Sequence, residues 1–392
     1  MSASLQLDVF SLFETQPGDL LLRPTSVTVA STAPNPSTTT RRRTLRLRVP
    51  VFVVGVGCTK FLRPLSHSKE YHQLAKEAAA KALEDSRIPY AQVKAAVASY
   101  CYGDPSSGQR AMYELGMTGI PIFNCNSYCS SGSSAIMLGK NLVQSGNTIN
   151  PGKLSNGERD GCIPCIAHKN HKQSQWNPNA LLTKQISIED IKNPAKSIGD
   201  PLTTAMSAPT ADGAAALHGL QHNAVEILGQ EMETDSLQTL QGGYNDVVEY
   251  TGITPQDIDV LEVHDCFASA ELFMYEALGL AGPGEGAKLI ESAEWIKSRG
   301  GIGETALLGN RWVVNPSGGL ESKGHPIGAS GVAQAVELSL QLRGDAGNRQ
   351  ILFRDPRKRV GLQHNYGLGS ACVVTLYGKF DATDKSEEVS KL

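Results

Sequence analysis

The amino-acid sequence predicts an α/β protein whose parallel sheets are covered by helices on both faces. Strand-like and helix-like segments alternate along most of the chain. The strand-like segments are continuous apolar runs, such as VFVVGVG at 51–57, which is typical of strands that are buried on both faces. A chain of 392 residues is also too long for a single core, so two halves or two domains are expected.

Regular structure is expected to begin at the strand of residues 51–57. Residues 70–88, EYHQLAKEAAAKALEDSRI, then contain helix formers with apolar residues at helical spacing. Four further elements complete this part: strands within AAVASYCYG (95–103) and IPIFNCNS (120–127), and helices within GQRAMYELG (108–116) and SSAIMLGKNLVQSG (133–146).

The second part of the chain repeats this alternation. Helices are expected near 241–251, within SAELFMYEALG (269–279) and within ASGVAQAVELSLQLRG (329–344). Strands are expected within IDVLEVHD (258–265), RWVVNPSGG (311–319), KRVGLQHNYG (358–367) and SACVVTLYG (370–378).

One region interrupts the pattern. After the helix that ends at Gly146, a crossover should lead to another apolar strand, but the chain continues with the polar, turn-rich NTINPGKLSNGERDGCIPC. The first sheet is therefore predicted to lack a strand.

Composition narrows the classes of function. The net charge of −3 and the absence of a basic face argue against nucleic acid as a partner. The longest apolar runs are far shorter than the roughly 20 residues that cross a bilayer, so no membrane span is expected. Eight unevenly spread cysteines without a secretory signal predict a reducing, intracellular compartment.

Both ends of the sequence contain possible addresses. Ser390, Lys391 and Leu392 form the tripeptide that the peroxisomal import receptor reads, which predicts a peroxisomal location. The alternative is a mitochondrion, because residues 20–50 contain six Arg, ten Ser or Thr and no acid. Four prolines in that stretch favour a disordered extension instead.

The stretch NCNSYCSSGSSAIM at 124–137 contains a candidate nucleophile. Cys129 lies where a strand gives way to a helix, and backbone N–H groups at a helix start favour the thiolate. Cys125, on the preceding strand, is expected to belong to the core. A structural role for Cys129 also stays open at this point.

Two histidine-containing segments are candidates for proton transfer. EVHDCF at 262–267 ends a strand, and alternation along a strand puts His264 and Cys266 on one side and Asp265 on the other. Two convergent groups suit proton transfer better than metal binding. His325 lies in the glycine-rich loop NPSGGLESKGHPIGASG (315–331), where it is a plausible base or a turn residue of no consequence.

Together these segments resemble the thiolase family, and specifically its sterol carrier protein 2 type, from about Val51 to Phe380. YCSSGS is similar to the nucleophile motif, HDCF to the sterol-carrier variant of the Asn-Glu-Ala-Phe motif, and GHP to the histidine loop. QHNYGLGSACVVTLYG resembles the closing loop and strand.

The resemblance implies cleavage of 3-oxoacyl-CoA by CoA, with coenzyme A as co-substrate and no other cofactor or metal. It implies that Cys129, deprotonated by His325, takes the acyl group, and that Cys266 protonates the departing enolate of acetyl-CoA or propionyl-CoA and then activates CoA. His264 and His325 would stabilise the enolate oxygen. The N–H groups of Cys129 and Gly369 would form the oxyanion hole, with Gly324 in the substrate loop; Cys372 fits no motif.

The family fold implies two similar βαβαβαββ halves in five αβαβα layers, with a loop domain inserted in the first half. By similarity, residues 1–50 are a disordered extension, 51–222 the first half, 223–380 the second half and 381–392 a tail without a sterol-carrier domain. Family members are homodimers, so a homodimer is expected.

The departure from the family lies at 147–165, where a strand and most of the loop domain are expected to be missing. Cys162, Cys165, His168 and His171 stand there at two-residue gaps. They form either a zinc or redox cluster or a chance arrangement at a junction. A rival to the enzyme is therefore a non-catalytic thiolase-like protein that binds acyl-CoA or lipid, inactivated by the lost segment.

Overall fold

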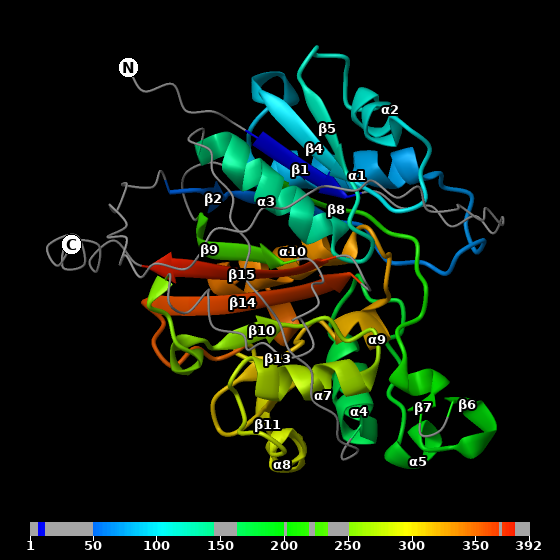
Figure 1. Cartoon of the computed structure of the whole chain (residues 1–392), viewed down its shortest axis with the longest axis vertical. Helices are drawn as coiled ribbons and strands as arrows, with labels where there is room; N and C mark the ends of the chain where they lie inside the picture. Colours follow the sequence, from blue (N-terminus) through cyan, green and yellow to red (C-terminus); the bar gives the residue numbers. More distant parts are fainter. Residues whose placement is uncertain are drawn as a thin grey trace, which may run out of the picture.

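The computed structural model describes residues 7–11, 50–144, 163–199, 202–218, 224–233, 251–367 and 371–380. Within these residues two mixed sheets are stacked, with helices between them and on both outer faces (Figure 1). This arrangement confirms the predicted α/β class and the predicted order of five αβαβα layers.

The first sheet has the strand order β3-β8-β1-β4-β5. Its strands are β3 (Gly55–Cys58), β8 (Ala215–His218), β1 (Leu7–Ser11), β4 (Ala95–Ser99) and β5 (Ile122–Cys125). The helices next to it are α1 (Tyr71–Ser86), α2 (Ser107–Tyr113) and α3 (Ser131–Gln144). Small residues line the outer face, where alanines of α1 pack with Met112 against β4 and β8.

The second sheet has the order β13-β10-β14-β15-β9-β2. Its strands are β13 (Val313–Val314), β10 (Val260–Glu262), β14 (Lys358–Gly367), β15 (Ala371–Phe380), β9 (Val225–Glu233) and β2 (Phe52–Val53). Helices α7 (Ala268–Ala277), α8 (Gly286–Glu291) and α4 (Ile163–Ser174) share a core with the outer face of this sheet.

The middle layer consists of α3 and α10 (Ser330–Arg343), which lie between the two sheets. Side chains of both helices, such as Ile136 and Val336, pack with Val97 of the first sheet and Tyr377 of the second in one buried cluster. Because both faces of α10 contact protein, nearly all of its residues are buried. It ends at Gly344, whose φ of +90° suits glycine.

The two sheets repeat one pairing pattern. In the second sheet β13, β10 and β14 run parallel, β15 is antiparallel to β14, and β9 is antiparallel to β15. In the first sheet β5, β4 and β1 run parallel, β8 is antiparallel to β1, and β3 is antiparallel to β8. Strand β1 therefore occupies the position that β14 has in the other half.

This position corrects two predictions. The first sheet does not lack a strand among the described residues, because Leu7–Ser11 fills its central position, between β8 and β4. The expectation of a disordered extension is wrong for these five residues, while 1–6 and 12–49 lie outside the described residues. Residues 147–162 of the departing segment also lie outside them. The other domain boundaries stay predictions, although β2 pairs with β9 of the second sheet.

Most predicted elements are present. The helices predicted within 70–88, 108–116, 133–146, 269–279 and 329–344 all form, as do the strands at 358–367 and 370–378. The helix predicted near 241–251 lies outside the described residues except for Thr251. Strands β8 and β9 were not predicted.

The remaining described strands and α-helices lie outside the two main sheets. They are α5 (Ile188–Ile191), β6 (Ser197–Gly199), β7 (Leu202–Thr203), β11 (Glu294–Lys297), β12 (Glu304–Leu307) and α9 (Gly319–Lys323). Among the described helices, none has the length and apolar character that crossing a membrane would need.

We expect the substitution Val9→Pro to destabilise the protein. Strand β1 has a neighbour on each side, so the backbone N–H of Val9 belongs to the ladder, and proline removes it. The partner group left buried and unpaired costs about 1–3 kcal/mol. Thermal unfolding should show a lower midpoint for Val9→Pro than for Val9→Ile, which keeps the donor. Equal midpoints would contradict a structural role for β1.

Candidate active site

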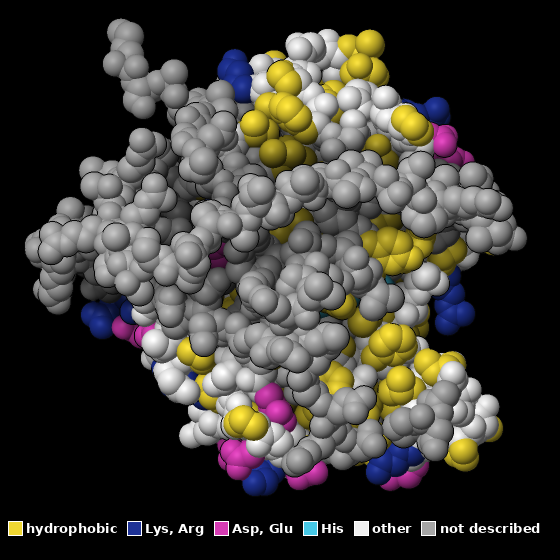
Figure 2. Space-filling view, viewed as in Figure 1, with side chains coloured by type: hydrophobic (Ala, Val, Ile, Leu, Met, Phe, Trp, Pro, Cys, Tyr) yellow, Lys and Arg dark blue, Asp and Glu magenta, His cyan; other side chains and the backbone are white. Residues whose placement is uncertain are grey.

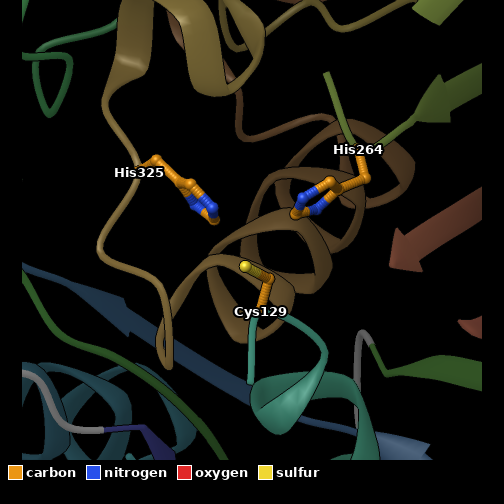
Figure 3. A group of neighbouring side chains, drawn as sticks. All are labelled: Cys129, His264 and His325. Atoms are coloured by element: carbon orange, nitrogen blue, oxygen red, sulfur yellow. The ribbon is translucent and has the colours of Figure 1, made fainter. Parts of the chain in front are cut away.

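The three segments singled out in the sequence meet at one place. Cys129, His264 and His325 each present a sulfur or ring nitrogen, and these atoms all lie within 4.8 Å of one another (Figure 3). The two imidazole rings meet edge to face, with centroids 5.1 Å apart and an angle of 79° between their planes. All three side chains are buried, so the group is shielded from bulk water.

Cys129 comes from the first sheet, between β5 and α3. The preceding residue, Tyr128, has a φ of +51°, and its carbonyl accepts a hydrogen bond from the Ser131 N–H at 3.0 Å. This tight turn places Cys129 two residues before the first helical residue, as predicted. Cys125, at the end of β5, packs against the core between the sheets, in agreement with its predicted role.

His264 and Cys266 come from the segment that follows β10. Asp265 points the other way, as strand alternation predicts, and its Oδ1 accepts a hydrogen bond from the Leu320 N–H at 2.7 Å. Burial raises the pKa of the Cys266 thiol to about 12, and the nearby Asp265 and Cys129 add to this rise. Cys266 is therefore a thiol at neutral pH, which suits a proton donor.

His325 follows α9 and Gly324. The φ of Gly324 is +104°, and a Cβ on this residue would lie 2.9 Å from the Cβ of Ala211, so both backbone and space favour glycine. The backbone N–H of His325 donates to the Pro209 carbonyl at 3.0 Å. The predicted substrate-loop residue Gly324 thus lets the chain turn tightly into His325.

A segment that the sequence did not single out connects the two histidine loops. The Ala208 N–H donates to the Cys266 carbonyl at 2.9 Å, and the next carbonyl, that of Pro209, holds His325. This segment lies far from both loops in sequence, and although APTADGAAAL (208–217) resembles the first half of the family, Ala208 and Pro209 offer no catalytic side chain. Only the tertiary structure reveals its function as a bridge.

Both site histidines are neutral at pH 7. Burial holds the pKa of His264 well below its usual range, and the nearby His325 and His364 lower it further. Burial, assisted by the Lys323 ammonium, lowers the pKa of His325 to about 3. Neutral imidazoles can each offer one lone pair and one N–H, so the site combines possible bases and donors around a thiol.

Buried carboxylates hold in place the segment that contains His264 and Cys266. Asn170 of α4 donates from Nδ2 to Asp265 Oδ2 at 3.0 Å and to Glu271 Oε2 at 2.8 Å. Lys169 forms an ion pair with Glu271 at 2.7 Å. This network connects α4, α7 and the segment after β10, and so fixes the backbone from which His264 and Cys266 project.

The cysteines outside this group have other surroundings. Cys372 is buried among apolar side chains on the outer face of the second sheet. Cys165 is disulfide-bonded, whereas the predicted reducing compartment implied free thiols throughout. Cys162 and Gly369 lie outside the described residues.

Of the predicted zinc or redox cluster formed by Cys162, Cys165, His168 and His171, the zinc alternative gains no support from the described residues. The bonded Cys165 offers no free thiolate. His168 Nδ1 lies 2.9 Å from the Ile186 carbonyl and His171 Nε2 lies 3.2 Å from the Ala205 carbonyl, so both rings are engaged by backbone. The donors of Cys129, His264 and His325 are also of types that bind zinc. Their combination with the protonated Cys266 suits acyl transfer better.

Comparisons with known proteins agree with this geometry. Residues 238–379 match the family model described as thiolase C-terminal domain-like. Sterol carrier protein 2 of Bos taurus is 40% identical over 409 residues, covering 84% of this chain and 72% of that protein. Non-specific lipid-transfer protein-like 2 of Caenorhabditis elegans is 37% identical over 83% of this chain and 95% of its own length.

A solved structure shows the same fold. The Acat5 thiolase from Ascaris suum in complex with coenzyme A superposes with a TM-score of 0.60 at 16% identity, covering 85% of this chain and all of that one. The bovine alignment has 409 positions, but 84% of 392 residues is only about 329. About 80 aligned positions therefore have no residue in this chain, which agrees with a shortened segment.

Proposed function

Because this chain belongs to the thiolase family, is of the sterol carrier protein 2 type and is an acyl-CoA acyltransferase, we propose that it cleaves 3-oxoacyl-CoA with CoA. The products are acetyl-CoA or propionyl-CoA and a shortened acyl-CoA. The observation that supports this proposal most strongly is the meeting of Cys129, His264 and His325 within 4.8 Å.

The first half-reaction transfers the acyl group to the enzyme. His325 takes the proton of Cys129, and the thiolate attacks the 3-keto carbon of the substrate. The bond between C2 and C3 then breaks, leaving the acyl group on sulfur and an enolate of acetyl-CoA or propionyl-CoA. The Cys266 thiol gives its proton to the enolate carbon, which completes the first product.

The second half-reaction returns the acyl group to CoA. The Cys266 thiolate takes the proton of the incoming CoA thiol, and the resulting CoA thiolate attacks the thioester on Cys129. The bond to Cys129 breaks, the shortened acyl-CoA leaves, and the Cys129 thiolate regains its proton from His325. Every proton that is taken up is returned, so the cycle needs no further co-reactant.

Charge on the substrate oxygens is stabilised by hydrogen-bond donors. The proposed donors are His264 and His325 for the enolate oxygen, partly through a water, and the N–H groups of Cys129 and Gly369 for the tetrahedral intermediate. Donors that are fixed before the reaction lower its barrier because they need no reorganisation. The low pKa values of both histidines keep cationic charge out of the resting site.

We expect Cys129→Ala to lower thiolysis of acetoacetyl-CoA by at least about 10⁴-fold, because the acyl group then has no acceptor. Cys266→Ala should lower turnover by about 10²- to 10⁴-fold while Cys129 can still be acylated, because proton transfer is lost but the nucleophile remains. Thiolysis assays and mass mapping of the trapped acyl group give both results.

The matched controls are Cys125→Ala and Cys372→Ala, which should keep turnover because neither thiol belongs to the site. An acyl group on Cys125, with Cys129 free, would contradict the assignment of the nucleophile. Full turnover in Cys266→Ala combined with loss in Cys372→Ala would show that the proton donor is the other cysteine. The non-catalytic alternative requires that the unaltered chain binds acyl-CoA but does not cleave it.

The exposed edge of the first sheet supports a homodimer. Strand β5 is the last strand on its side of the described sheet, and Phe123 on it is 39% exposed. Tyr102, Tyr113, Met117 and Tyr128 are exposed as well, and Figure 2 shows apolar side chains on the first-sheet end of the molecule. An open strand edge beside apolar surface favours pairing with a second copy.

We expect Phe123→Asp to shift the protein from dimer to monomer in light scattering after size-exclusion chromatography. The carboxylate would have to be buried without a partner in the interface. Phe123→Leu serves as the matched control and should stay dimeric. A monomeric unaltered chain would overturn the proposal.

A peroxisomal location stays a prediction of the sequence, because Ser390, Lys391 and Leu392 lie outside the described residues. Deleting Leu392 should leave a tagged protein in the cytosol, since the import receptor reads the complete tripeptide. Fluorescence microscopy of an N-terminally tagged protein measures this. Import that survives the deletion but fails without residues 1–50 would place the address at the other end.

A further inference from the structure

Each site histidine uses one ring nitrogen to contact a side chain outside the group in Figure 3. The Nδ1 atom of His325 lies 2.7 Å from Ser330 Oγ, and Nδ1 of His264 lies 3.0 Å from Asn365 Nδ2. In a neutral imidazole one nitrogen carries the proton and the other a lone pair. The two contacts therefore decide which form each ring takes.

The tautomer of His325 follows from a backbone carbonyl. Ser330 Oγ donates its hydrogen to the Pro326 carbonyl at 3.0 Å, and a carbonyl can only accept. A hydroxyl has one proton, so Ser330 Oγ must accept from His325 Nδ1–H. The Nε2 atom of His325 is left with the lone pair, as a base for a thiol proton requires.

The tautomer of His264 follows from a longer chain of hydrogen bonds, the relay, which begins at the Gly331 carbonyl. It runs through the side chains of Gln363, Ser133 and Asn365 to His264. Gln363 Nε2 donates to the Gly331 carbonyl at 2.6 Å and to Ser133 Oγ at 2.7 Å. The other end of the amide, Oε1, accepts from the Tyr377 hydroxyl at 2.8 Å. The orientation of Gln363 is thus fixed at both ends, and Ser133 Oγ receives a hydrogen bond.

The Ser133 hydroxyl in turn fixes the orientation of the Asn365 side-chain amide. Its single hydroxyl proton is directed to Asn365 Oδ1 at 2.8 Å, which turns the Nδ2 group of Asn365 towards His264. Nδ2 can only donate, so Nδ1 of His264 accepts and carries no proton. The proton of the neutral ring therefore lies on Nε2, opposite to the arrangement in His325.

The surroundings favour this arrangement of the relay, and the Gln363 Nε2 contacts within it, at 2.6 and 2.7 Å, are shorter than its 3.3 Å contact with Gln334 Oε1. The side chains of Ser133, Gln363 and Asn365 are fully buried, so bulk water cannot replace a partner. A Cβ on Gly331 would lie 2.4 Å from Asn365 Oδ1 and 2.5 Å from Ser133 Oγ. Glycine at 331 thus gives the relay the space it occupies.

We propose that Asn365 is a positioning residue that holds His264 as an Nε2–H donor, while Ser330 holds His325 with a lone pair on Nε2. The two imidazoles then have different tasks: His325 removes the proton of Cys129, and His264 donates to the oxygen that becomes negative. This inference rests on the proposed thiolase reaction and assigns the tasks within it.

The direct test is the tautomeric state of each ring, measured by nitrogen-15 NMR of the full chain with labelled histidine. The expected result is Nε2–H for His264 and Nδ1–H for His325, each identified from the signal that is lost on its substitution by glutamine. A protonated Nδ1 on His264 would overturn the proposal. This measurement needs no turnover, so its outcome can be distinguished from a failure of the proposed thiolase activity.

The kinetic test is Asn365→Leu, which removes the donor at similar volume. It should lower kcat for acetoacetyl-CoA thiolysis by about 10²-fold with little change in KM, as loss of an oxyanion donor does, and give a mixed His264 tautomer. The control Gln341→Leu removes a buried amide that bonds Glu337, the Arg349 carbonyl and the Ile351 N–H, none of which belongs to the relay. It should keep both the kcat and the His264 tautomer. An unchanged kcat in a folded Asn365→Leu variant would refute the positioning role while leaving the thiolase intact.

Discussion

The pairing of Leu7–Ser11 with two neighbouring strands is the constraint on which the first half of the molecule depends. This strand lies parallel to β4 on one side and antiparallel to β8 on the other. An empty position there would leave backbone groups of both neighbours unpaired, at about 1–3 kcal/mol for each that stays buried. Several such groups would rival the whole 5–15 kcal/mol stability of a typical domain.

The site depends on this sheet because its residues come from both halves. Cys129 is positioned by β5 and α3, whereas His264 and His325 follow elements of the second half. Helices α3 and α10 pack together between the sheets and so fix the distance of Cys129 from the two histidines. The relay from Gln363 of the second half to Ser133 of the first half also crosses the contact between the halves. One hydrogen-bonded unit therefore both joins the halves and orients His264.

Sequence patterns predicted the elements and motifs whose signals are local. The helix at 70–88 has a clear period, strand alternation separated His264 and Cys266 from Asp265, and the turn before α3 placed Cys129. The strand at Leu7–Ser11 was missed because five residues carry little periodic signal and their partners are more than 80 residues away. The bridging segment with Ala208 and the relay through Asn365 were missed because backbone contacts and amide orientations leave no pattern in the sequence.

The central claim is that residues 7–11 complete the first sheet and so keep Cys129 close to His264 and His325 of the second half. Hydrogen–deuterium exchange on the intact chain, read by mass spectrometry, tests it most directly. We expect the amides of residues 7–11 to be protected as strongly as those of β4 at 95–99, because a strand with two neighbours has its backbone groups paired. Exchange of residues 7–11 at the rate of an unstructured peptide, with β4 still protected, would contradict the account.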